Sequence, residues 1–109
     1  MNDKELIIKA AKAIGLEGCW VDEWTFGDSS LVVGGYDYNP LTNPHDAFTL
    51  QTELYMRVFI NKEDSTTTAL VGNMSSDVSG YALEHHKGDV LKATMRAIVR
   101  CAADTVRED

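Results

Sequence analysis

The sequence predicts a single α+β domain over residues 1–109, with a mostly antiparallel sheet of about four strands ordered α-β-β-α-β-β-α. Apolar residues recur at helical spacing in 2–14, 43–54 and 87–106, and the four runs between them are rich in β-branched and aromatic residues. A chain of 109 residues fits one domain with one modest core. Helices must cover the apolar faces of the sheet, either on both faces or on one.

The first predicted helix, 2–14, begins at an asparagine suited to capping and ends before Gly15, which readily takes a left-handed conformation. Strands are expected at 19–26 and 31–38, joined by a polar turn into an antiparallel hairpin. Gly34-Gly35 weakens the second of these strands, and we expect a β-bulge there.

The second helix has the clearest start. Asn43 caps it, Pro44 suits the first turn, where a missing N–H costs nothing, and Asp46 has the spacing to complete a capping box. Strands at 55–61 and 66–71 follow as a second hairpin, because both are rich in β-forming residues and a polar turn separates them.

The last part of the chain is predicted as a loop followed by the longest helix. Residues 72–80 are rich in Ser, Asn and Asp, which indicates a loop, and 81–86 fits a loop or a short strand. Helix 87–106 carries an apolar stripe made of Leu91, Thr94, Met95, Ile98, Ala102 and Val106. It also carries a basic stripe, Lys92, Arg96 and Arg100, which fits either a solvated edge or a docking stripe for an acidic patch, such as one on a second copy.

The turn Asn39-Pro-Leu-Thr-Asn-Pro-His-Asp-Ala47, the strand at Leu54–Ile60 and the helical segment Arg96-Ala-Ile-Val-Arg100 together carry a resemblance. This part of the chain, 36–106, resembles the phage ABA sandwich domain and the NinX-like accessory proteins of tailed phages and prophages. The resemblance implies a sheet covered by helices and a phage or prophage origin. It supplies no catalytic residues.

The formal net charge of −7 argues against direct binding of nucleic acid or of an anionic membrane surface. The charge is uneven, because residues 1–86 sum to −8 and residues 87–107 to +3. No apolar run is long enough for a transmembrane helix, and the start of the chain lacks the pattern of a signal peptide. Cys19 and Cys101 are therefore expected to be reduced, mostly buried thiols in a bacterial host cytoplasm.

The sequence contains no recognised catalytic or nucleotide-binding motif, and we expect no catalytic residue, no cofactor and no metal ion. His85 and His86 are adjacent and so point in different directions, which makes a poor ligand pair even with Asp89 nearby. His45 beside Asp46 would join them only through tertiary contacts.

We expect the chain to bind another host or phage protein, of which a basic nucleic-acid-binding protein is one class. Charge complementarity would speed association, and aromatic anchors would supply more of the affinity. The predicted partner surface lies on the first hairpin and consists of Asp22, Glu23, Trp24, Asp28, Tyr36 and Asp37.

Three function classes stay open. The first is a non-enzymatic phage or prophage accessory protein, such as an inhibitor of a host defence (of the anti-CRISPR or anti-restriction type) or of a nucleic-acid-handling complex. The second is a structural or regulatory phage homo-oligomer that associates through the last helix. The third is a small metal-dependent hydrolase that uses the histidines and acidic residues.

Overall fold

The computed structural model describes residues 2–25, 28–73 and 77–106, and at 23–25, 28, 73 and 77 it describes the backbone only. In chain order the elements are α1 (Asp3–Ala13), β1 (Cys19–Thr25), β2 (Asp28–Val33), β3 (Tyr36–Tyr38), α2 (Pro44–Glu53), β4 (Arg57–Asn61), β5 (Thr66–Asn73), β6 (Asp77–His85) and α3 (Val90–Asp104). The α+β class is confirmed. The described strands form two antiparallel sheets, β1-β2-β3 and β4-β5-β6, in place of one sheet of about four strands.

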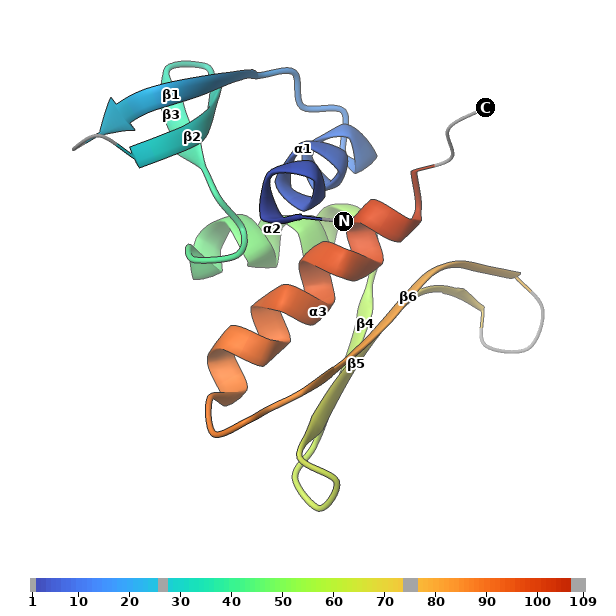
Figure 1. Ribbon diagram of the computed structural model, residues 1–109. Coiled ribbons are helices and arrows are strands. Elements are labelled where there is room, and N and C mark those ends of the chain that lie inside the picture. The colour runs from blue at the N-terminus through green and yellow to red at the C-terminus, as the bar shows by residue number, and fades with distance from the viewer. Residues whose placement is uncertain (1, 26–27, 74–76, 107–109) are drawn as a thin grey trace.

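The helices lie between the two sheets (Figure 1). α3 packs on one face of β5 and β6, and α1 and α2 pack against α3. α1 also turns Ile7 and Ala11 toward Leu31 and Tyr38 of the small sheet. Within the described residues each sheet is therefore covered by helices on one face, which is the second of the two arrangements considered above.

The predicted strand 31–38 is two strands, because Gly34 and Gly35 form a turn and not a bulge. Their φ angles of +59° and +85° are left-handed, a conformation that glycine adopts without steric cost. The turn pairs Val33 with Tyr36 and adds β3 to the sheet.

The loop predicted at 72–80 is wrong at 72–73 and 77–80, because β5 continues to Asn73 and β6 starts at Asp77, and residues 74–76 lie outside the described part. Gly80, which suggested a loop, lies within β6 because α3 passes close to it. A Cβ atom on Gly80 would lie 2.5 Å from the carbonyl oxygen of Cys101. The polar residues of this segment therefore do not keep 72–73 and 77–80 out of the sheet.

α3 is the most buried element, because the sheet covers one side of it and the other helices cover another. Its buried residues are Ala93, Met95, Ala97, Ile98, Val99, Cys101, Ala102 and Ala103. The predicted stripe is wrong at Leu91, which is 58 % exposed. Leu91 lies in the first turn, one turn before Thr94, whose hydroxyl contacts Thr67 in β5. Within the described residues, none of the helices is long and apolar enough to cross a membrane.

The helix starts follow the sequence closely. The side chains of Asn2 and Asn43 accept hydrogen bonds from the backbone N–H groups of Glu5 and His45, each at 2.9 Å. The expected capping box at α2 is wrong: the Asp46 carboxylate accepts instead from the backbone N–H of Asn39, at 2.9 Å. Asp46 therefore fixes the turn that leads into α2.

We predict that Asn43→Ala lowers the free energy of unfolding by about 1 kcal/mol, because it removes the acceptor at the start of α2. Asn43→Asp keeps an acceptor at the same position and should retain most of the stability. Urea denaturation followed by circular dichroism measures both variants. Equal losses in the two variants would show that the cap is not the source of the effect.

Candidate functional site

The structure separates the residues of the predicted partner surface on the first hairpin. Asp22 is exposed, and it accepts hydrogen bonds from Trp20 Nε1 at 3.3 Å and from Ser29 Oγ at 3.1 Å. Tyr36, 80 % exposed, lies in β3 beside Val33, at the opposite end of β2. Asp37 is exposed on the other face of the small sheet, because neighbouring strand residues point to opposite faces. The side chains of Glu23, Trp24 and Asp28 lie outside the described part.

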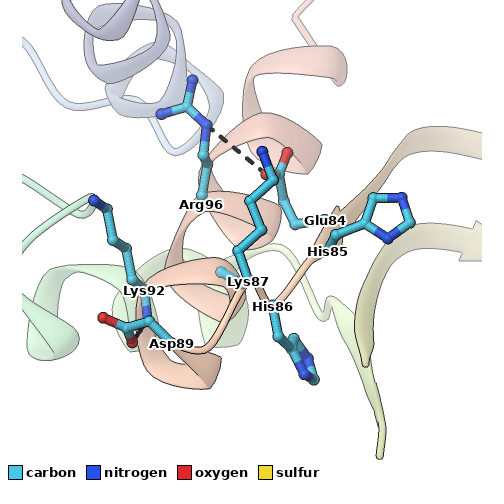
Figure 2. A pocket seen from close by; sticks show the side chains of 8 residues that line it. Glu84, His85, His86, Lys87, Asp89, Lys92 and Arg96 are labelled. Atoms are coloured by element: carbon cyan, nitrogen blue, oxygen red, sulfur yellow. Dashed lines mark hydrogen bonds and ion pairs between the residues drawn. The ribbon is translucent and has the colours of Figure 1, made fainter. Parts of the chain in front are cut away.

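The three histidines do not converge. His45 is exposed on α2, and His85 is exposed at the end of β6. The buried His86 points away from His85 (Figure 2), and its Nε2 lies 2.9 Å from the Thr67 hydroxyl. Among the described residues, no group of three or more His, Cys, Asp or Glu side chains is arranged to hold a metal ion.

A hollow of about 430 Å³ opens beside the start of α3 (Figure 2). Its lining is charged and consists of Glu84, His85, His86, Lys87, Asp89, Lys92, Ala93 and Arg96. Both carboxylates have structural partners: Asp89 accepts from the backbone N–H of Lys92 at 2.9 Å, and Glu84 pairs with Arg96 at 3.9 Å and also with Arg100. The hollow therefore has nearly balanced charges whose acids already bind groups of the chain.

Two members of the basic stripe form ion pairs within the chain. Arg96 contacts Asp3 of α1 at 3.0 Å and Glu84 of β6 at 3.9 Å, and Arg100 also pairs with Glu84. These contacts join α1, β6 and α3. The sequence suggested that this stripe is either a solvated edge or a docking stripe for an acidic patch. Neither interpretation describes the ion pairs that Arg96 and Arg100 form within the chain.

A second hollow, of about 230 Å³, lies where the small sheet meets α2 and is lined by Tyr38, His45 and Asp46 among others. The Tyr38 hydroxyl is buried and has no hydrogen-bond partner within the described part of the chain. Burial and the nearby Asp46 charge raise the pKa of Tyr38 well above its usual value. Asp46 is bound to Asn39, and Asp37 also lines this hollow.

The cysteines are both free thiols. Cys19 is exposed and Cys101 is buried, so the expectation of buried thiols is correct for one of the two. Burial, together with the Asp104 charge, raises the pKa of Cys101 to about 12. Cys101 is therefore protonated at neutral pH and is a poor nucleophile.

An unusual surface lies on the side of sheet β4–β6 that faces away from α3. We call it the outer sheet face and define it by Phe59, Leu70, Val78, Tyr81 and Leu83. Phe59, Val78, Tyr81 and Leu83 are 49 %, 47 %, 51 % and 37 % exposed, although they are large apolar or aromatic side chains. They surround the buried Leu70, and a shallow depression of about 480 Å³ lies among them. No described element packs on this face (Figure 1).

The sequence did not reveal the outer sheet face, because an irregularity in β6 breaks the alternation that would mark it. Val71 pairs with Gly80, but the next residue, Gly72, pairs with Val78, so Ser79 is an extra residue. The shift turns Val78 to the same side as Tyr81. A strict period of two would have placed these residues on opposite faces.

We predict that Tyr38→Phe leaves the free energy of unfolding unchanged or raises it by about 1 kcal/mol, because the lost hydroxyl is buried without a partner. Tyr36→Phe, at an exposed position, is the control. The raised pKa destabilises the folded state only at high pH: the unfolded tyrosine ionises from about pH 10 and the folded one later, so stability is lost as pH rises beyond that point. Tyr38→Phe should reduce this loss, and a large drop in stability at pH 7 would contradict the prediction.

Comparisons of the chain with protein-family models, with curated proteins and with solved structures found no match.

Proposed function

We propose that this chain acts by binding another protein, without catalysis, as a phage- or prophage-encoded accessory factor in the bacterial cytoplasm. The supporting observation is the outer sheet face, where exposed aromatic and aliphatic side chains on β4 and β6 surround Leu70. Monomeric proteins rarely expose a large continuous apolar surface, and where one occurs it often marks a site of protein association. The phage origin is supported by the sequence resemblance alone, and two free thiols fit a reducing compartment.

Three of the four carboxylates that line the two described hollows contact other groups of the chain, with Asp37 as the exception within the described residues, and this favours a binding function over a hydrolytic one. Asp46 and Asp89 each accept a hydrogen bond from a backbone N–H group of the chain, and Glu84 forms an ion pair with Arg96. These contacts stabilise local structure. A general base needs a carboxylate or imidazole within reach of a substrate proton. The metal-dependent hydrolase is therefore the weaker proposal.

The charge of the chain favours a basic partner, such as a host protein that normally handles nucleic acid. The net charge of −7 would attract such a partner over long distances, whereas apolar contacts at the outer sheet face would supply most of the affinity. A defence or nucleic-acid-handling complex contains proteins of this kind. The first-hairpin residues stay a second proposed surface, with Tyr36 as their most exposed aromatic side chain.

We predict that Tyr81→Lys abolishes capture of a bacterial host protein by the immobilised chain, because it places a charge on the outer sheet face, opposite Leu70. Captured proteins are identified by mass spectrometry and confirmed with purified partner by calorimetry. Tyr36→Lys is the matched control, since it makes the same change on the first hairpin. Loss of binding in Tyr36→Lys alone would move the site to the first hairpin, and no specific partner for the wild-type chain would contradict the proposal.

A further inference from the structure

The two edges of sheet β4–β6 differ in how their backbone groups are occupied. At the β6 edge the backbone N–H of Tyr81 donates to the Asp104 carboxylate at 3.2 Å. Arg100 donates to the carbonyl oxygen of Leu83 at 3.1 Å. Both side chains come from α3, and they occupy groups that another strand would need. The β6 edge is therefore blocked against further pairing.

The β4 edge carries no comparable contact among the described residues. Residues that lie opposite each other in antiparallel strands are alternately hydrogen-bonded and not hydrogen-bonded to each other. Tyr81 and Leu83 direct backbone groups away from β5, so neither belongs to a hydrogen-bonded pair with β5. Through the register of the sheet, this alternation places Phe59 in a bonded pair with β5. The N–H and C=O groups of Val58 and Ile60 therefore point out of the open edge.

Large apolar side chains flank these open backbone groups on both faces of the sheet. Phe59 is 49 % exposed on the outer sheet face, and Ile60 is 57 % exposed on the opposite face. β4 packs mainly against β5, so its other edge is accessible from both sides. A hydrogen-bonding edge with exposed apolar side chains favours pairing with another strand.

The sequence of β4 is complementary to itself when two copies run antiparallel with Phe59 at the centre. Val58 of one copy then lies opposite Ile60 of the other, and each of their open N–H and C=O groups gains a partner. The two Phe59 residues form a close cross-strand aromatic pair. No residues of like charge face each other in this register.

The ends of the same register are complementary in charge. Arg57 of one copy lies opposite Asn61 of the other, on the same face of the sheet. The Asn61 side chain exchanges hydrogen bonds with Asp64 at 3.2 Å and 3.1 Å, which holds that acid beside the edge. Arg57 has no hydrogen bond or ion pair from its side chain within the described residues, so it is available to the Asp64 carboxylate of a second copy.

We infer that the open edge of β4 is a self-association surface, which pairs antiparallel with β4 of a second copy, centred on Phe59, into one continuous sheet. The inference does not depend on the proposed function, because the pairing is made by the backbone groups of Val58 and Ile60, which are not part of the outer sheet face. A five-residue strand forms a small interface, so the dimer is reversible and depends on concentration. Each copy carries −7, and added salt therefore strengthens the dimer by screening their repulsion.

Sedimentation velocity over a wide concentration range tests this inference. The wild-type chain should form a dimer that strengthens with salt. Ile60→Lys should weaken it at least about tenfold, since each copy then places a charge at the paired edge. Val78→Lys changes the outer sheet face away from β4 and should leave the dimer intact. A chain that is monomeric at every concentration, or a dimer lost in Val78→Lys and kept in Ile60→Lys, would overturn the inference.

A charge exchange tests the register with variants at exposed positions. Arg57→Asp alone should weaken the dimer about threefold, and the double variant Arg57→Asp with Asp64→Arg should restore it. Amide exchange by NMR provides a direct readout: the Val58 and Ile60 amides should exchange more slowly as concentration rises, whereas the Phe59 amide, already bonded to β5, should not change. Concentration-independent exchange at Val58 and Ile60 would overturn the inference even if the chain dimerises elsewhere.

Discussion

The rest of the structure depends on the close packing of α3 against β5 and β6. Gly80 has no side chain at the point where α3 comes nearest, and the facing surface of the helix is built largely from alanine and Cys101. Because α1 and α2 then cover the other side of α3, the helices form an inner layer. Small side chains at one contact thus determine that the outer faces of the two sheets are left for solvent or for partners.

α3 also creates the difference between the edges of the larger sheet. Arg100 and Asp104, near the end of the helix, reach the backbone of β6, whereas β4 lies on the far side of β5. The ion pairs of Arg96 and Arg100 with Asp3 and Glu84 are partly exposed, and such pairs contribute little to stability. The Arg100–Glu84 pair also keeps the Arg100 guanidinium beside the Leu83 carbonyl oxygen, to which it donates at the edge of β6.

The sequence predicted features that depend on local chemistry and missed those that depend on tertiary contacts. The caps at Asn2 and Asn43 and the left-handed Gly15 follow from interactions within a few residues, and all three are present. The sequence offers the second half of β6 only as one of two alternatives for 81–86 and predicts its first half as a loop, because its polar composition resembles a loop and its extra residue hides the alternation of apolar side chains. The separation of Asp22 from Tyr36 likewise depends on tertiary structure, since the turn at Gly34-Gly35 places Tyr36 in β3, and β2 lies between β3 and the β1 strand that holds Asp22.

The outer sheet face and the open edge of β4 meet at Phe59, which belongs to both. Pairing at the edge would place two copies of the outer sheet face side by side, because Phe59 of each copy lies on the same face of the extended sheet. The apolar surface would then be continuous across both copies, and a partner that contacts both would gain affinity from two sites at once. The two associations depend on salt in opposite ways: added salt strengthens contact between two acidic copies and weakens contact between an acidic copy and a basic partner. A basic partner would also offset the repulsion between two acidic copies, so its binding and the pairing of β4 would favour each other.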